Sequence, residues 1–332
     1  RDHGGDIDAA MAAFGGAPEA WIDLSTGINR CPYPRADLPD TAWTALPTAA
    51  AERRLIAAAR QAYALPQHAD CVPLAGAQAA IQAIPRLRPP GRVAIVAPTY
   101  NEHAAAFAAA GWTVREIAEP DAAGDADALV IVNPNNPDGR TWTPAALLRL
   151  VKPGRLTVVD ESFADTAPML SLCPSAGIEG LVILRSFGKF YGLAGVRLGF
   201  ACGASRDVAA LAAMAGPWAV NGPALSLGAQ ALGDPQWAAA TRATLARDAA
   251  RLDALATGAG WTLAGGTTLF RLYQTPSATA ARAHLAAHRI WTRIFPYHPG
   301  WIRIGLPGPK AEWTRLRDAL RVLHQQGSPP DR

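Results

Sequence analysis

A lysine, a serine and an arginine stand close together in the second half of the chain. Lys189 ends the string Ser186-Phe187-Gly188-Lys189, and Arg197 follows within the next ten residues. A lysine amine can form a Schiff base, while a hydroxyl and a guanidinium can hold a phosphate group. A pyridoxal phosphate site needs this grouping. The alternative is a surface lysine in a loop between a strand and a helix, and the string alone leaves both open.

Four short apolar runs predict the buried strands that would position these side chains. They cover residues 93–96, 128–132, 156–159 and 181–184, and helical patterns such as that of 102–110 lie between them. Such an alternation is typical of a parallel sheet covered by helices on both faces. Polar clusters at 133–136, 160–161 and 186–189 follow the last three strands. Because ligands bind beyond the carboxyl ends of parallel strands, we expect one shared site there.

The remaining segments predict a three-part organisation. Residues 1–50 are rich in proline and glycine and are expected to form an irregular arm. Further patterns predict helices over 52–63, 205–215, 224–232, 236–257, 278–288 and 310–325, and strands over 267–273 and 301–305. We therefore expect an N-terminal arm over 1–45 that contributes to the small domain and the active site, a large domain over 46–220 and a small C-terminal domain over 221–332.

Composition excludes several classes of function. Half of the 332 residues are hydrophobic and 17% are charged, as in a globular protein with a sizeable core. The net charge of +4 comes from scattered side chains, so no nucleic-acid surface is expected. The four cysteines lie far apart without metal-binding spacing, which favours reduced thiols in the cytoplasm and no metal. No signal peptide is visible, and the uncharged stretch 208–233 is broken by prolines, so no membrane association is expected.

The order of these motifs along the chain resembles the fold-type I pyridoxal phosphate enzymes, the aspartate aminotransferase superfamily. The resemblance extends over nearly the whole chain, through the strings at 76–78, 98–103, 133–139, 160–163, 186–197 and 301–305. It implies an α/β fold in which a mainly parallel seven-stranded sheet lies between helices, with a smaller α+β domain. It also implies pyridoxal 5′-phosphate as the cofactor.

The resemblance assigns roles around the cofactor ring. Lys189 would carry the Schiff base, and Asp160 would pair with the pyridine nitrogen and keep it protonated, which makes the ring an electron sink. Tyr100 would stack on the ring and Asn136 would hydrogen-bond its 3′ oxygen. Without the resemblance, a tyrosine at a sheet edge and an asparagine in a turn explain the last two equally well. His103 either supports Asp160 or is an ordinary core histidine.

The resemblance also assigns the residues that would bind the anionic groups of the cofactor and the substrate. Ser186 and Arg197 would hold the cofactor phosphate together with the backbone amides of Ala77 and Gln78, at the positive end of a helix. Taken alone, that string is an ordinary strand–turn–helix connection. Arg303 would bind the substrate carboxylate, because its planar donors pair bidentately with a carboxylate. A solvent-facing strand arginine is the alternative.

Two strings near the start narrow the choice within the superfamily. His3-Gly4-Gly5 and Ser25–Asn29 resemble the opening of the L-threonine-O-3-phosphate decarboxylases, enzymes of cobalamin biosynthesis. That resemblance implies decarboxylation of L-threonine O-3-phosphate, a small phosphorylated amino acid, to (R)-1-aminopropan-2-ol O-phosphate. It makes His3 and Asn29 candidates for substrate binding in an arm that closes over the site. An arm with nothing bound is the alternative.

Three positions depart from the wider pattern. Phe163 stands where many relatives have a tyrosine that donates a second hydrogen bond to the 3′ oxygen, which fits the decarboxylases better. Asp138 stands where threonine or serine is usual. The segment 45–48 lacks the tyrosine that reaches the phosphate of a partner subunit, although the fold still implies a homodimer.

The cofactor residues leave the reaction open. An aminotransferase such as histidinol-phosphate aminotransferase would share every one of them, so decarboxylation and transamination cannot be separated by these residues. A non-catalytic accessory partner in the cobalamin pathway is a remote alternative. A DNA-binding regulator is not expected, because no winged-helix segment precedes the predicted arm.

Overall fold

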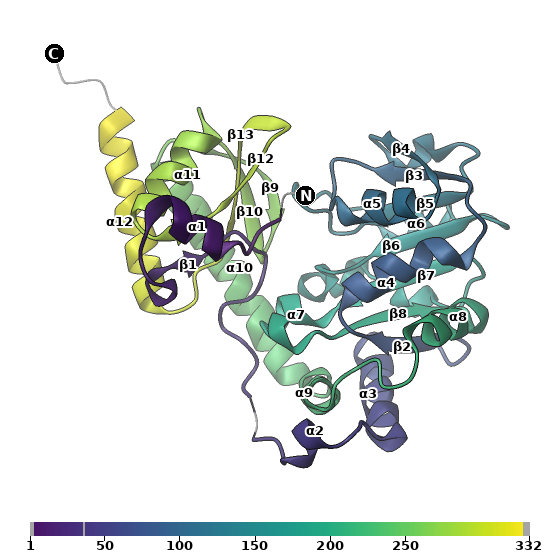
Figure 1. Cartoon of the computed structure of the whole chain (residues 1–332). Helices are drawn as coiled ribbons and strands as arrows, with labels where there is room; N and C mark the ends of the chain where they lie inside the picture. The colour runs from purple at the N-terminus through teal and green to yellow at the C-terminus, as the bar shows by residue number, and fades with distance from the viewer. Residues whose placement is uncertain (1–2, 36, 328–332) are drawn as a thin grey trace. The chain divides into compact units, whose positions relative to one another are not determined.

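The structure, a computed structural model, describes residues 3–35 and 37–327. These residues form two compact units (Figure 1). The larger unit covers residues 33–238, and the smaller unit combines the residues up to 32 with those from 239 onward. The helix α10 (Pro235–Gly258) runs from the larger unit into the smaller one.

A seven-stranded sheet forms the centre of the larger unit. Its strands lie in the order β2 (Asp70–Leu74), β8 (Gly199–Gly203), β7 (Leu181–Ser186), β6 (Leu156–Asp160), β5 (Ala128–Val132), β3 (Arg92–Val96) and β4 (Thr113–Ile117). Only β8 is antiparallel to its neighbours, β2 and β7. The mainly parallel seven-stranded sheet expected from the resemblance is therefore confirmed.

Helices cover both faces of this sheet. Every residue of β5, β6, β7 and β8 is buried, so neither face of these strands meets solvent. Alternate strand residues such as Val130 and Val158 join one apolar cluster with Ile81 of α4, Phe107 of α5 and Leu211 of α8. The helices of the larger unit are α2 (Thr41–Thr44), α3 (Ala49–Ala62), α4 (Ala77–Ala83), α5 (Glu102–Ala109), α6 (Pro144–Leu148), α7 (Phe187–Phe190), α8 (Ser205–Ala215) and α9 (Gly222–Leu232).

The smaller unit is an α+β unit, as expected. Its four-stranded antiparallel sheet has the order β12 (Arg293–Phe295), β13 (His298–Gly305), β10 (Phe270–Gln274) and β9 (Thr262–Thr267). Two short strands, β1 (Ile22–Asp23) and β11 (Ile290–Trp291), pair in parallel. The helices are α1 (Ile7–Phe14), α11 (Ala278–Ala287) and α12 (Lys310–Gly327). The irregular arm expected over residues 1–50 thus contains a helix, whose N-terminus is capped by the side chain of Asp6.

The boundaries of the compact units differ from the domain boundaries expected from the sequence. The segments 33–45 and 221–238 lie in the larger unit, because α9 packs along α3 and α2 packs against α9. Gly228 allows the close approach of α9: a Cβ at this position would lie 2.5 Å from a methyl carbon of Leu198 and 2.8 Å from one of Leu55. Among the described residues, each helix is too short or too polar to cross a membrane.

Candidate active site

The carboxyl ends of the parallel strands surround one pocket in the larger unit. All the cofactor-binding candidates predicted from the sequence line it, namely Ala77, Gln78, Tyr100, Asn136, Asp160, Ser186, Lys189 and Arg197. The parallel strands β5, β6 and β7 each end at this edge of the sheet. Because β8 runs the other way, its beginning lies at the same edge, which brings Arg197 to the residues that follow β2 and β7.

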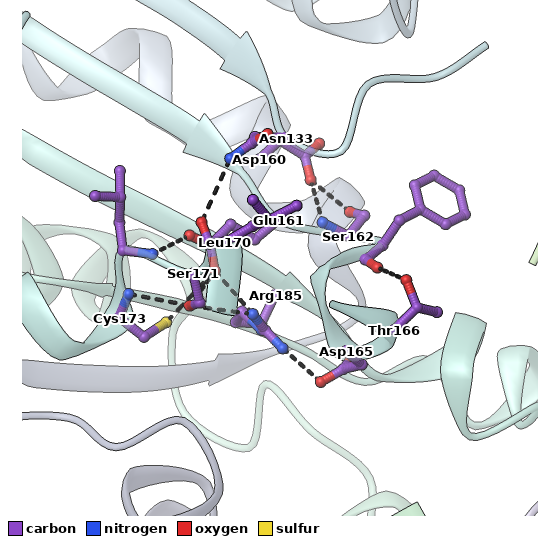
Figure 2. Close-up of polar contacts among 12 residues, drawn as sticks. Asn133, Asp160, Glu161, Ser162, Asp165, Thr166, Leu170, Ser171, Cys173 and Arg185 are labelled. Carbon is purple, nitrogen blue, oxygen red and sulfur yellow. Dashed lines mark hydrogen bonds and ion pairs between the residues drawn. The ribbon is translucent and has the colours of Figure 1, made fainter. Parts of the chain in front are cut away.

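A buried carboxylate stands at the end of β6. Asp160 is 2% exposed, and its Oδ2 lies 2.8 Å from Nε2 of His103. Its Oδ1 accepts hydrogen bonds from the backbone N–H of Ser162 at 2.9 Å and from the hydroxyl of Ser162 at 2.5 Å (Figure 2). Burial alone would raise the pKa of Asp160, but the hydrogen bonds and charge of His103 and the bonds from Ser162 together hold that pKa below its ordinary value. The group therefore offers a negative charge to the pocket.

One part of the pocket lies where α4 begins. Gly76 has a φ of +78°, and a Cβ at this position would lie 2.9 Å from a terminal nitrogen of Arg197. At Gly199 a Cβ would lie 2.3 Å from the backbone nitrogen of Ala77. The two glycines therefore permit a close approach of the start of β8 to the start of α4. Three kinds of hydrogen-bond donor line this part of the pocket: the guanidinium of Arg197, the hydroxyl of Ser186 and the N–H groups of the first turn of α4. These N–H groups have no acceptor within the helix.

Lys189 lines the same pocket. It belongs to the single-turn helix α7, and its Nζ lies 5.9 Å from the centroid of the Phe163 ring. Phe163 is 4% exposed and lines the pocket, so this position contributes an apolar face and no hydroxyl. The amine of Lys189 thus lies next to a hydrophobic wall.

Tyr100 is held at the side of the pocket by a chain of polar contacts. Its hydroxyl donates to Oε1 of Gln78 at 3.3 Å, and Nε2 of Gln78 donates to Oε2 of the buried Glu102 at 3.1 Å. The ring of Tyr100 also meets that of His103 edge-on, with centroids 6.2 Å apart. These contacts fix the orientation of the tyrosine ring.

Asp138, the departure noted in the sequence, has a structural role. One of its carboxylate oxygens accepts from Nδ2 of Asn135 at 2.7 Å and from the backbone N–H of Arg140 at 3.0 Å, and the other accepts from Nε of Arg140 at 2.8 Å. Thr99 donates to Oδ1 of the same Asn135 at 2.7 Å. The loop that carries Asn136 is therefore tied down on both sides.

The chemical groups that line the pocket suit pyridoxal phosphate. The cofactor has a basic ring nitrogen at one end, a phosphate at the other and an aldehyde between them. The lining of the pocket presents a buried carboxylate, a guanidinium with close backbone approach, and an amine, one group for each of these three features. A buried carboxylate is best stabilised by a positively charged partner, which a protonated ring nitrogen supplies. The residues therefore fit this cofactor.

The three substrate-binding candidates lie in the smaller unit. Arg303 of β13 is 4% exposed; its Nη2 donates to the backbone oxygen of Ser25 at 2.7 Å, and Cζ lies 5.0 Å from the ring centroid of Phe270. The solvent-facing alternative for this arginine is therefore wrong. Asn29 is buried and accepts from the backbone N–H of Cys31 at 2.9 Å, whereas His3 is exposed.

The two N-terminal strings that carried the narrower resemblance contact each other. The backbone N–H of Gly5 donates to Oγ of Ser25 at 2.7 Å. A Cβ on Gly4 would lie 2.4 Å from the backbone oxygen of Ser25, so the closeness of the two segments requires a glycine. The fully buried Ser25 in turn donates to Oδ1 of Asp23 at 2.5 Å.

The sequence did not mark two residues that lie next to candidate site residues. Ser162 donates twice to Asp160, and its place two residues after a carboxylate is the local pattern of an Asx turn, which was a usable signal. Arg293 lies opposite Arg303 in the β12–β13 ladder. Nothing local marks Arg293, because its place depends on the register of two strands.

The chain is similar to known proteins along most of its length. The model of the aminotransferase class I and II family matches residues 38–320. A threonine-phosphate decarboxylase from Sinorhizobium sp is 44% identical over 329 residues, 96% of this chain and 97% of that protein. The threonine-phosphate decarboxylase of Pseudomonas aeruginosa is 43% identical over 326 residues, with the same coverage.

Solved structures show the same fold at low identity. The histidinol-phosphate aminotransferase of Clostridium acetobutylicum aligns with a TM-score of 0.81 at 20% identity, over 91% of this chain and 99% of that one. The histidinol-phosphate aminotransferase of Sinorhizobium meliloti, solved in complex with pyridoxal-5′-phosphate, aligns with a TM-score of 0.79 at 20% identity, over 97% and 95%. At this identity the likeness concerns the fold alone.

Proposed function

The chain belongs to the aminotransferase class I and II family, and from this premise we propose that it is a pyridoxal phosphate-dependent decarboxylase of L-threonine O-3-phosphate. The product is (R)-1-aminopropan-2-ol O-phosphate, a building block for cobalamin. The observation that carries this proposal is the identity of 43–44% to two threonine-phosphate decarboxylases over 96% of the chain.

The pocket supports the cofactor part of the proposal. Asp160 would hold the ring nitrogen, and Ser186, Arg197 and the first amides of α4, which line the same pocket, would hold the phosphate. When bound, pyridoxal phosphate supplies an electron-withdrawing ring that accepts the electron pair left at the substrate α-carbon as carbon dioxide departs. Asn136 would donate to the 3′ oxygen, and Tyr100 would pack against the ring.

The proton transfers are assigned to Lys189. Its Nζ would hold the aldehyde carbon of the cofactor and, as an amine that is not so engaged, would carry a proton. After carbon dioxide has left, the lysine delivers that proton to the α-carbon. The apolar wall of Phe163 next to Nζ excludes water from this side of the lysine.

Two arginines of β12 and β13 suit a substrate with two anionic groups. L-threonine O-3-phosphate carries a carboxylate and a phosphate, and guanidinium groups pair bidentately with both. We assign the carboxylate to Arg303 and make Arg293, its neighbour in the ladder, the candidate for the substrate phosphate. His3 and Asn29 complete the candidate set, supported by the contact between the two N-terminal strings.

We also propose a homodimer in the cytoplasm. Trp43 and Leu46 of the larger unit are 68% and 64% exposed, and Trp43 lines a groove together with Ala45, Pro47 and Pro223. Exposed apolar side chains of this kind suit contact with a second copy. The four cysteines are free thiols, as suits a reducing compartment. Light scattering on the purified chain would measure its mass in solution.

The decisive experiment offers L-threonine O-3-phosphate to the protein with pyridoxal phosphate and no keto acid. We expect release of carbon dioxide and the amine phosphate in equal amounts. Turnover that requires a keto acid, with L-histidinol phosphate as a better substrate, would instead identify an aminotransferase. Cofactor binding without turnover of either compound would favour the accessory role.

A further inference from the structure

A buried ion pair lies directly behind two residues of the pocket. Glu161 follows Asp160 at the end of β6, and Arg185 precedes Ser186 at the end of β7. Nη1 of Arg185 donates to Oε2 of Glu161 at 2.8 Å, and their side chains are 3% and 0% exposed (Figure 2). The guanidinium also lies over the ring of Tyr63, 4.3 Å from its centroid.

Further contacts anchor this pair to the segment that follows β6. Arg185 forms a second ion pair, through Nη2, with the carboxylate of Asp165. Glu161 accepts from the hydroxyl of Ser171 and from the backbone N–H of Leu172, each at 2.5 Å. Both ends of the pair are thus fixed by groups outside the pocket.

Stability alone is a poor explanation for such a pair. The free-energy cost of removing two charges from water offsets their mutual attraction. Apolar residues of the same volume stabilise a core equally well. Burial raises the pKa of Glu161 above its ordinary value, although Arg185, Ser171 and Leu172 each act to lower it. A carboxyl group whose ionised form is opposed this strongly by burial points to a role in positioning the two strand ends that carry the pair.

The pair connects the two ends mechanically. Successive side chains of a strand point to opposite faces, so Arg185 leaves β7 on the face opposite to Ser186. The backbone N–H of Glu161 donates to the oxygen of Leu184 at 2.9 Å, which continues the β6–β7 ladder beyond Asp160. Any sliding or rotation of one strand end against the other would stretch the ion pair and displace a pocket residue.

We propose that the Glu161–Arg185 pair is a positioning pair that fixes the spacing between Asp160 and Ser186. Through them it fixes the distance between the partners of the ring nitrogen and of the phosphate. This inference rests on the proposed cofactor site. It predicts a selective effect: only a ligand that engages both ends of the pocket depends on their spacing.

The test compares two ligands in matched variants. Glu161→Gln keeps the shape of the side chain and removes its charge. Asp207→Asn is the control, because Asp207 is also 2% exposed and is held bidentately, by Arg88 at 2.7 and 3.1 Å, but flanks no pocket residue. The dissociation constants of pyridoxal phosphate and of pyridoxal, which lacks the phosphate, are measured by absorbance titration, and unfolding of each apoprotein by denaturant.

We expect Glu161→Gln to raise the dissociation constant of pyridoxal phosphate by about tenfold and that of pyridoxal by less than about threefold. Asp207→Asn lowers the stability of the apoprotein but leaves both constants within about twofold. Arg185→Lys, which retains the charge but loses the forked geometry, is measured alongside and weakens pyridoxal phosphate selectively as well.

Two results would overturn the positioning role. One is that the ratio of the two dissociation constants stays unchanged in both Glu161→Gln and Arg185→Lys. The other is that Asp207→Asn changes this ratio as much as Glu161→Gln does. Failure of the unmodified protein to bind pyridoxal phosphate would instead refute the proposed function, and with it the inference. The two failures are therefore distinguishable in one set of titrations.

Discussion

Nε2 of His103 lies 2.8 Å from Oδ2 of Asp160, and both side chains are almost completely buried. His103 is the second residue of α5, and Asp160 is the last residue of β6. Two elements that are far apart in the chain therefore meet at the pocket. Of the two roles left open for His103 by the sequence, the geometry corresponds to support of Asp160. An ion pair or hydrogen bond here keeps the carboxylate ionised where burial opposes it.

The first prediction concerns this contact. His103→Leu removes one of the partners of a buried carboxylate, and we expect the free energy of unfolding to fall by about 1–3 kcal/mol. Denaturant unfolding of the apoprotein measures this. Ser162→Ala is the companion variant; it removes a hydroxyl donor but leaves the backbone donor in place, so its loss should be smaller. Equal stability of His103→Leu and the parent would contradict the account.

The second prediction is a pH dependence with a defined sign. The pKa of Asp160 is lower in the folded protein than its ordinary value, so the folded state binds fewer protons than the unfolded state in that range. Its contribution is fully present above the ordinary value and is lost as the pH falls through the folded-state pKa. The difference in unfolding free energy between the parent and Asp160→Asn should therefore stay constant above about pH 5 and narrow as the pH falls below the ordinary carboxyl pKa of about 3.8. A constant difference would mean that the group does not titrate as inferred.

The strands that form the floor of the site were the easiest part to predict. Every residue of β5, β6 and β7 is buried, and a continuous apolar run is a strong local signal. The strand β8 was missed because Gly199–Gly203 contains mostly small residues, and β4 because it carries Arg115 and Glu116 at the edge of the sheet. The helix α1 was missed although Asp6 caps it, since the surrounding glycines and prolines suggested an arm.

The site was predictable where its residues are neighbours in sequence or follow a strand directly. The string from Ser186 to Lys189 and the carboxylate at Asp160 belong to this class. Contacts that depend on tertiary geometry were not, and the ion pair of Arg185 with Glu161 is the clearest case. Its residues stand next to predicted site residues, but only the pairing of β6 with β7 brings them together.

The third prediction tests the lysine. Lys189→Ala should abolish both the visible absorbance of the cofactor-loaded protein and its turnover, because Lys189 supplies the amine that forms the Schiff base. Lys152, an exposed-loop lysine of the same unit, provides the control variant Lys152→Ala, which should keep both. Retention of the visible band in Lys189→Ala after dialysis would remove the lysine from its assigned role.

The fourth prediction separates substrate binding from cofactor binding at Arg303. Arg303→Ala should raise KM for L-threonine O-3-phosphate by about tenfold to a hundredfold, because a charge-assisted bidentate contact is lost. The dissociation constant of pyridoxal phosphate should stay within about twofold. Since the arginine also donates to the backbone oxygen of Ser25, unfolding of the variant is measured in parallel. Equal loss of substrate and cofactor binding would show that the arginine acts only through the fold.

The last prediction concerns the ring at position 163. Phe163 lines the pocket beside Lys189 and has no donor for the 3′ oxygen of the cofactor. Phe163→Tyr adds a hydroxyl at this wall, and a donor stabilises the ionised form of the oxygen that accepts from it. The pH midpoint of the visible band of the bound cofactor should therefore shift downward, by about one unit for a hydrogen bond worth about 1.4 kcal/mol.

Phe163→Leu is the matched control, because it alters the packing of the wall without adding a donor. Its midpoint should stay near that of the parent, while its stability falls through the loss of buried apolar surface. If Phe163→Tyr and Phe163→Leu shift the midpoint equally, the effect comes from packing and not from a new hydrogen bond. A downward shift confined to the tyrosine variant would show that the apolar ring keeps the cofactor oxygen less ionised than a tyrosine would, and would make position 163 a determinant of the electronic state of the cofactor.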